Sequence, residues 1–291
     1  FQMLTASLTL RLIMYMIGNV LTVASLYILF NQSGLHRNFR MVLFILIIFG
    51  FLRSTFTYCI TFVGYIVPPA QEEILRTYFV EAFVFVICGF ALASLSLSVE
   101  RWVAIYKPKI YERYSHKTAL AMGTLAAEVI ITGITGLLAN VYNATQWPLI
   151  LVTTIFGLVS LIIAIIVWSR AKHLLRNRNS SLGQRFQIAE TNRTSPVYLS
   201  ISLNESISIT AMSIVGFLML QRDNTDVIAS DDVLVDLVDA LGAWRIIFIN
   251  LVLIYYSFMT RRSRKLIIAH MARDSNVSTA DYFTGLRKMW N

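Results

Sequence analysis

Apolar residues along this chain gather in seven long runs, separated by polar segments. A helix of about 20 mainly apolar residues can cross the roughly 30 Å hydrocarbon core of a bilayer. Each run reaches that length, so the pattern predicts seven membrane-spanning helices. The ten-residue segments of alternating polarity that are typical of a membrane β-barrel are not seen. The predicted spans are Leu8–Phe30, Met41–Val67, Tyr78–Val103, Thr118–Tyr142, Pro148–Trp168, Pro196–Leu220 and Leu237–Met259.

The composition agrees with an all-α membrane protein. Of the 291 residues, 56% are hydrophobic and 14% are charged, against about 25% charged in a typical soluble domain. So few charged groups cannot cover the surface of a soluble protein of this size. We therefore expect a seven-transmembrane helix bundle over residues 1–259 and a cytoplasmic tail over residues 260–291. No internal repeat is visible, which argues against a transporter built from two related halves.

The positions of the basic residues predict how the bundle is oriented. Cytoplasmic loops of membrane proteins are enriched in Lys and Arg. If the N-terminus is extracellular, the cytoplasmic segments contain 20 of the 25 basic residues. The net charge of +9 then belongs to these loops and implies no nucleic-acid partner. The four segments are Asn31–Arg40, Glu100–Lys117, Ser169–Ser195 and Thr260–Asn291.

Two short patterns near the membrane have simple interpretations. Arg261–Lys265 is basic and precedes apolar residues, so it predicts a juxtamembrane helix lying on anionic lipid, although anchoring the topology would explain its charge equally well. Asn143 begins the one glycosylation sequon on a predicted outer loop, close enough to the membrane that the transferase would have little room.

Catalysis has no support in the sequence. No zinc-protease, nucleophile-elbow or phosphate-loop motif is present. The four histidines fall on separate predicted cytoplasmic segments, so we expect no metal site. Cys59 and Cys88 lie within predicted spans, and a disulfide is not indicated. We predict a protein that is not an enzyme and that needs no cofactor.

Glu100 and Arg101 stand where the third predicted span reaches the cytoplasmic side. An acid–base pair there can hold the helix end in one state, by pairing internally or with the sixth span. Release of the arginine would then open a cleft for a partner, which makes the pair a candidate two-state switch. Simple anchoring at the membrane interface is the alternative, since Arg and Trp are common at helix ends.

The stretch from Glu100 to Glu112 resembles the E/D-R-Y motif and following loop of seven-transmembrane G-protein-coupled receptors. Gly18-Asn19 in the first span is similar to their Gly-Asn pair. The chain departs from the large rhodopsin-like class in its seventh span, where Asn250 is not part of an Asn-Pro-x-x-Tyr motif. The sixth span also lacks a Trp-x-Pro pattern.

Two motifs narrow the resemblance to nematode serpentine chemoreceptors of the Sra superfamily. Glu100-Arg101, Ala104 and Tyr111-Glu112 are similar to its E-R-x-x-A…Y-E run. The segment Leu182–Arg193 resembles the L-x-x-R-Y/F-Q-x-x-E-N-x-R signature of the class E (Sre) receptors and their Srab neighbours. Ile110 and Thr191 depart from these patterns, which leaves the choice between the two families open.

The resemblance implies a chemosensory receptor in the plasma membrane of ciliated sensory neurons, which binds a small molecule and signals to a heterotrimeric G protein. For the inner-loop motif, a solvated amphipathic helix packed on the bundle is the structural alternative. Carried over by position, the resemblance assigns switching and G-protein coupling to Glu100, Arg101, Tyr111, Glu112, Arg185, Gln187 and Glu190.

Ionisable residues inside the predicted spans are candidates for ligand binding, because such groups usually face the interior of a bundle. Glu81 and Arg245 are predicted near the outer ends of spans three and seven, where they could meet across an outward cavity. Glu205 on span six is a further candidate for the ligand pocket. In the alternative interpretation, Arg53 pairs with Glu128 or Glu205 and simply holds helices together.

Asp232, Asp236 and Asp239 recur at helical spacing and could attract a cation, although a solvated loop face explains them as well. A different function class remains open: a seven-helix ligand-gated ion channel of the chemoreceptor type. Such channels have a cytoplasmic N-terminus, contrary to the charge distribution here. Staining of an N-terminal tag on intact cells distinguishes the two.

Overall fold

The computed structural model describes residues 6–31, 35–107, 147–176, 182–222 and 231–273, together with 111, 123, 126–127, 129–131, 133–134, 284 and 287. Of the predicted fourth span, Thr118–Tyr142, only scattered positions are among them, and these are helical. No strand occurs in the described part of the chain. Its long helices are α1 (Ala6–Asn31), α2 (Arg37–Ile66), α3 (Pro69–Tyr106), α6 (Trp147–Arg176), α7 (Leu182–Arg222) and α8 (Asp231–Arg273).

Each of these six helices contains a stretch long and apolar enough to cross a membrane. They correspond in order to predicted spans one, two, three, five, six and seven, so those predictions are confirmed. The helices nevertheless exceed the apolar runs. α7 begins 14 residues before the predicted start at Pro196, and α8 continues 14 residues past Met259. Hydropathy marks only the part of a helix that matches hydrocarbon, and polar residues extend the same backbone into water.

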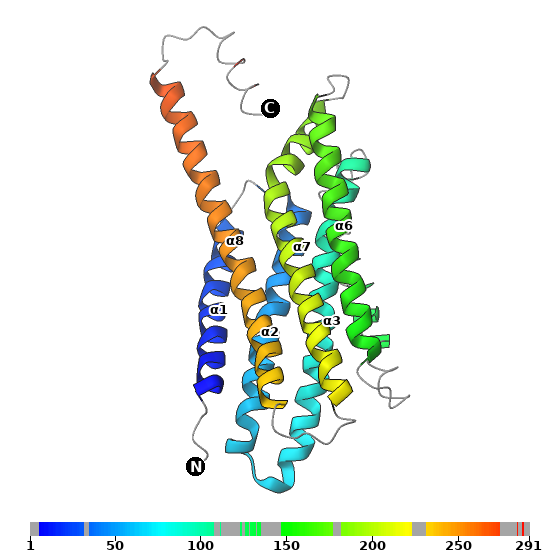
Figure 1. Ribbon diagram of the computed structural model, residues 1–291. Coiled ribbons are helices and arrows are strands. Elements are labelled where there is room, and N and C mark those ends of the chain that lie inside the picture. Colours follow the sequence, from blue (N-terminus) through cyan, green and yellow to red (C-terminus); the bar gives the residue numbers. More distant parts are fainter. Residues whose placement is uncertain are drawn as a thin grey trace.

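Successive helices of the described chain run in opposite directions from α1 to α2 to α3 and from α6 to α7 to α8 (Figure 1). We call the end where α1 begins the Ala6 end and the end where α3 finishes the Tyr106 end. α3 finishes at one end of the bundle and α6 begins at the other, which is the arrangement that a further span between Tyr106 and Trp147 requires. Two consecutive prolines, Pro68 and Pro69, form the turn between α2 and α3, where Pro69 occupies the first helical turn.

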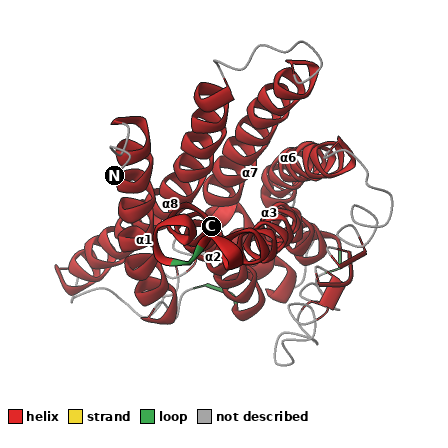
Figure 2. Cartoon of the chain, turned by 90° about the horizontal axis from the view of Figure 1, so that it is seen from below, coloured by secondary structure: helices red, strands yellow, loops and turns green. Residues whose placement is uncertain are grey.

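α3 is the central helix, since it packs against α2, α6 and α7 (Figure 2). The remaining neighbours close a ring: α6 on α7, α7 on α8, α8 on α1 and α1 on α2. This arrangement brings side chains from helices far apart in the sequence into one interior.

The bundle is apolar outside and partly polar inside. Val20, Phe30 and Tyr255 are each at least 66% exposed and suit a hydrocarbon surrounding. In contrast, Arg53, Arg101 and Arg245 are among the largest fully buried side chains of the described residues. A buried charge is costly unless it is paired, so the partners of these arginines mark the places where function can reside.

Candidate functional site

At the Tyr106 end, Arg101 forms a salt bridge with its chain neighbour Glu100. The guanidinium donates from Nε to Glu100 Oε2 at 2.5 Å and from Nη2 to Oε1 at 2.7 Å. A two-point contact of this kind is the strongest ion-pair geometry available to arginine. The guanidinium also lies over the ring of Phe39 on α2, 4.1 Å from its centroid. Both charges are completely buried and neutralise each other.

Two further segments contact this pair. The hydroxyl of Tyr111, just beyond α3, accepts a hydrogen bond from Arg101 Nη2 at 3.0 Å and donates to Glu100. Thr194 on α7 accepts from Arg101 Nη1 at 3.4 Å. The arginine is thus held by its own helix, by the segment after it and by α7, so α7 cannot move away without breaking a contact to Arg101.

His36, which precedes α2, ties the cluster to a fourth segment. Its Nδ1 lies 2.6 Å from the Tyr111 hydroxyl, and its backbone N–H donates to Glu190 Oε1 on α7 at 2.8 Å. We call Glu100, Arg101, Tyr111, His36 and Glu190 the inner polar cluster.

The electrostatics of the cluster follow from its burial. Burial, reinforced by the charge of Arg101 and opposed by that of Glu100, lowers the pKa of His36 to about 4. The ring is therefore neutral at physiological pH. Burial and then the carboxylate of Glu100 raise the pKa of Tyr111, so its hydroxyl stays protonated and able to donate.

Four of the seven residues predicted for switching and coupling thus meet in space: Glu100, Arg101, Tyr111 and Glu190. Glu112 lies outside the described residues. The backbone at Arg185 and Gln187 belongs to α7, while their side chains also lie outside the described part.

Sequence reasoning missed His36, Phe39 and Thr194 as members of this site. Thr194 follows Glu190 by four residues and therefore lies on the same helix face. This spacing could have been used to predict that Thr194 belongs to the site. The predicted inner-loop signature is the start of α7 itself, so it is continuous with the sixth span.

Further toward the Ala6 end, Arg245 on α8 pairs with Glu205 on α7. Arg245 donates from Nε to Glu205 Oε1 at 3.1 Å and from Nη2 to Oε2, and its guanidinium lies 4.5 Å from the ring centroid of Phe90. The predicted meeting of Arg245 with Glu81 is wrong, because Glu81 is exposed on α3. The cause is rotational: α3 turns Glu81 outward, while α7 turns Glu205 into the interior.

Arg53 on α2 forms no salt bridge with Glu205, whose carboxylate oxygens accept hydrogen bonds from Arg245 instead. The alternative partner, Glu128, lies outside the described residues. What surrounds the guanidinium instead is the Met212 thioether, 3.9 Å from Nη2, and the ring of Phe83, whose centroid is 5.8 Å away.

The acidic residues at the start of α8 do not form a purely solvated face. Arg11 on α1 forms salt bridges with Asp236 at 3.3 Å and with Asp239 at 2.5 Å. These contacts fasten α1 to α8 at the Ala6 end. Among the described residues, no cluster of His, Cys, Asp and Glu is suited to a metal ion.

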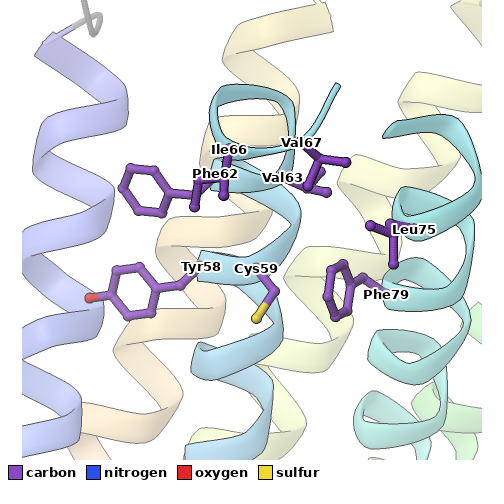
Figure 3. Close-up of a pocket in the computed structure, with 8 residues that line it drawn as sticks. All are labelled: Tyr58, Cys59, Phe62, Val63, Ile66, Val67, Leu75 and Phe79. Atoms are coloured by element: carbon purple, nitrogen blue, oxygen red, sulfur yellow. The ribbon is translucent and has the colours of Figure 1, made fainter. Parts of the chain in front are cut away.

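An apolar cavity of about 360 Å³ lies between α2 and α3 near their Ala6 ends (Figure 3). Phe79 and Leu75 extend from α3 toward α2, while Tyr58 extends its hydroxyl away toward α1. The size suits a small organic molecule. The lining residues are Tyr58, Cys59, Phe62, Val63, Ile66, Val67, Leu75 and Phe79.

Two remaining predictions concern the periphery. The basic stretch Arg261–Lys265 is helical, as predicted, but it belongs to α8, which continues through it to Arg273. In Figure 1 this part of α8 extends well beyond the end of its neighbour α1. Asn143, the predicted glycosylation site, lies outside the described residues.

A helical membrane bundle with a buried Glu–Arg pair closing one end has the features of a seven-transmembrane receptor. Comparison with protein families gives a match over residues 1–291, the entire chain, to the serpentine type 7TM GPCR receptor class ab chemoreceptor family. The chain belongs to this family, the Srab one of the two that the inner-loop motif indicated. No curated protein matches the chain. The protein is thus a multi-pass membrane receptor of seven-helix architecture.

Proposed function

We propose that the protein is a chemosensory receptor that binds a small molecule and signals to a heterotrimeric G protein. The observation that carries this proposal is the closed inner polar cluster, in which Arg101 is fully buried and joined to α7 through Thr194. A buried, neutralised arginine at the end of the central helix is a bistable element, since a shift of α7 would free it.

In this proposal the Tyr106 end is cytoplasmic and meets the G protein. Ligand binding nearer the Ala6 end displaces α7 relative to α3 and breaks the contacts of Arg101 with Tyr111 and Thr194. The exposed arginine then joins the flanking coupling residues Glu112, Arg185, Gln187 and Glu190 in receiving the G protein.

The same proposal places the ligand within reach of Glu205 and Arg245. Their salt bridge joins α7 to α8 in the interior, so a ligand that competes for either charge would change the packing of α7. α7 also carries Thr194 of the inner contact, which gives the ligand a continuous helix through which to act. Glu81, being exposed on α3, has no part in this pocket.

The proposed location is the plasma membrane of a ciliated sensory neuron, with the N-terminus extracellular. This rests on the family and on the excess of basic residues in the segments at the Tyr106 end. The six described spans with apolar outer faces support insertion in a bilayer.

A G-protein reporter assay in cultured cells tests the switch. Tyr111→Phe removes the hydroxyl that contacts Arg101, Glu100 and His36. Hydrogen bonds to charged groups contribute about 1.5–3 kcal/mol, so loss of these contacts should raise ligand-independent signalling about tenfold or more. Tyr106→Phe, the same change at an exposed tyrosine five residues earlier, should leave it unchanged.

A second experiment in the same assay replaces Arg101. Arg101→Ala should abolish signalling per receptor at the cell surface, because the released guanidinium is the proposed contact with the G protein. Signalling retained in Arg101→Ala, or basal signalling in Tyr111→Phe equal to that of Tyr106→Phe, would contradict the proposed role of the cluster.

A further inference from the structure

Arg53 is a charged side chain in the interior of the bundle, and no counter-charge from the described residues contacts it. It is 1% exposed. Within the described part of the chain, its Nε and Nη1 have no hydrogen-bond partner, and Nη2 reaches only the sulfur of Met212. A thioether is a weak acceptor, and an aromatic face at 5.8 Å offsets little of a full charge. The side chain of Tyr15 on α1 also interacts with Arg53, but a phenol supplies no counter-charge. Two of the three guanidinium nitrogens therefore remain able to bind an anionic acceptor.

The nearby described carboxylates have other partners. Glu205 is held at both oxygens by Arg245. Asp239 lies on α8 about one helical turn before Gly242, which packs against the guanidinium, and its carboxylate is 2.5 Å from Arg11. No described carboxylate forms a salt bridge with Arg53 within 4.0 Å.

The surroundings are nevertheless shaped around this guanidinium. Phe83 comes from α3, Met212 from α7 and Gly242 from α8, so three helices converge on the side chain from α2. Gly242 has no side chain, and a Cβ there would fall far inside contact distance of Nη2, Cζ and Nε of Arg53. The glycine leaves the space that the arginine occupies, which indicates a position built for a cation.

A buried charge without a partner costs several kcal/mol even after local relaxation. We propose that Arg53 is the anchor of a buried anion site, which receives the carboxylate of a small organic acid. A planar carboxylate matches the guanidinium fork, and the resulting bonds are charge-assisted. The proposal deepens the proposed chemosensory function, on which it rests, by naming the chemical class of the ligand.

The apolar cavity between α2 and α3 suggests which acids to use as probes. Cys59, in the cavity wall, follows Arg53 by six residues on α2, a rise of about 9 Å along the helix. Phe56, one turn beyond Arg53, packs against Phe79 of the cavity wall with ring centroids 6.4 Å apart. An acid whose carboxylate reaches Arg53 and whose hydrocarbon chain extends toward this wall would use both features, so hexanoate is a better probe than acetate.

The test is a thermal unfolding measurement on the purified full-length chain in lipid nanodiscs, with sodium hexanoate, sodium acetate or sodium chloride added to a low-salt zwitterionic buffer. Hexanoate should raise the unfolding midpoint of the wild type by several degrees, because a ligand that binds only the folded state stabilises it. It should raise the midpoint of Arg76→Met equally, since Arg76 is exposed on α3. Arg53→Met should show no rise.

We also expect the order of stability of the wild type and Arg53→Met to reverse between buffer without added anion and buffer with hexanoate. In the low-salt buffer Arg53→Met should unfold at the same temperature as the wild type or higher, because methionine removes an unpaired buried charge. With saturating hexanoate the wild type should become the more stable of the two. Arg53→Lys, which keeps the charge but loses the fork, should retain only part of the hexanoate response.

Three outcomes would overturn the proposal. Equal responses of wild type and Arg53→Met to hexanoate would remove Arg53 from the site. A response to chloride as large as that to hexanoate would assign the site to inorganic anions. A midpoint lowered by Glu128→Gln and restored by adding Arg53→Met would identify Glu128 as the internal counter-charge. Because no G protein is present in this measurement, its result is independent of whether the receptor signals as proposed.

Discussion

The buried pair of Glu205 and Arg245 carries opposite charges that neither lipid nor water can solvate. Glu205→Gln keeps the size of the side chain but leaves Arg245 charged and unpaired. Breaking a buried ion pair at one partner costs about 3–5 kcal/mol, so the unfolding midpoint should fall by several degrees. Glu81→Gln, the same change at an exposed glutamate, should have no measurable effect. Equal midpoints for the two variants would contradict the assignment of the pair as a structural contact.

His36 makes stability depend on pH. Its pKa is lowered from about 6.5 to about 4 in the folded protein, so between these values the unfolded chain binds a proton that the folded chain does not. The stability contributed by neutral His36 is therefore fully present above pH 6.5 and is lost as the pH falls toward 4. Unfolding midpoints measured across this range should fall less steeply in His36→Gln than in the wild type.

His173 supplies the matched control for this pH dependence, since it is exposed on α6. His173→Gln should leave the pH dependence of the midpoint as it is in the wild type. A curve for His36→Gln that runs parallel to that of the wild type between pH 4 and pH 6.5 would show that the histidine does not titrate as described.

Individual residues of the inner polar cluster differ in how far the sequence could predict them. Glu100, Arg101 and Tyr111 lie close together in the chain and form a local motif, so their meeting was foreseeable. His36 reaches the cluster only because α2 packs on α3, and Glu205 meets Arg245 only because α7 and α8 are rotated toward each other. Such contacts depend on helix rotation, which hydropathy does not specify when both faces of a helix are largely apolar.

At the scale of the helix, α7 contains Pro196 in its interior. Proline has no N–H, so the carbonyl of Asn192, four residues earlier, loses its usual backbone donor. The hydroxyl of Ser195 donates to this same carbonyl at 2.6 Å. Ser195 therefore satisfies the group that Pro196 leaves open, and the helix continues through the proline.

Because the Ser195 hydroxyl replaces the N–H donor that Pro196 lacks, we expect substitutions of these two residues to have non-additive effects on stability. Ser195→Ala should destabilise the wild type by about 1 kcal/mol or somewhat more, because the partly buried carbonyl of Asn192 loses its remaining donor. In a Pro196→Ala background the restored amide N–H should reduce that loss by about 1 kcal/mol or more. A double-mutant cycle of unfolding free energies measures the coupling. Additive effects of the two changes would contradict the hydroxyl's role.

Helix positions were predicted better than helix ends, for a physical reason. The apolar runs record where each helix crosses hydrocarbon, and six of the seven expected spans coincide with described helices. The starts of α7 and α8 contain Arg, Gln, Asp and other polar residues, which hydropathy assigns to loops. Backbone hydrogen bonds continue the helix through them nonetheless, which places Glu190 on the same rigid element as Glu205.

At the scale of the whole molecule, α7 connects two polar contacts that lie at different depths in the bundle. Thr194 binds Arg101 at the Tyr106 end, and Glu205 binds Arg245 eleven residues further along the same helix. These residues are about 16 Å apart along the helix axis at 1.5 Å per residue. A ligand that alters the inner packing of α7 can therefore act on Arg101 through a single helix.

The orientation of the whole bundle decides whether this helix can carry a signal inward. The segments at the Tyr106 end contain most of the 25 basic residues, and such segments stay in the cytoplasm. An epitope tag at the N-terminus should therefore be stained on intact cells, and a tag at the C-terminus only after permeabilisation. In that orientation Arg101 and its cluster lie on the cytoplasmic side, where the proposed G protein would bind. The reverse staining pattern would place the cluster outside, contradict G-protein coupling through Arg101 and favour the ligand-gated channel, whose N-terminus is cytoplasmic.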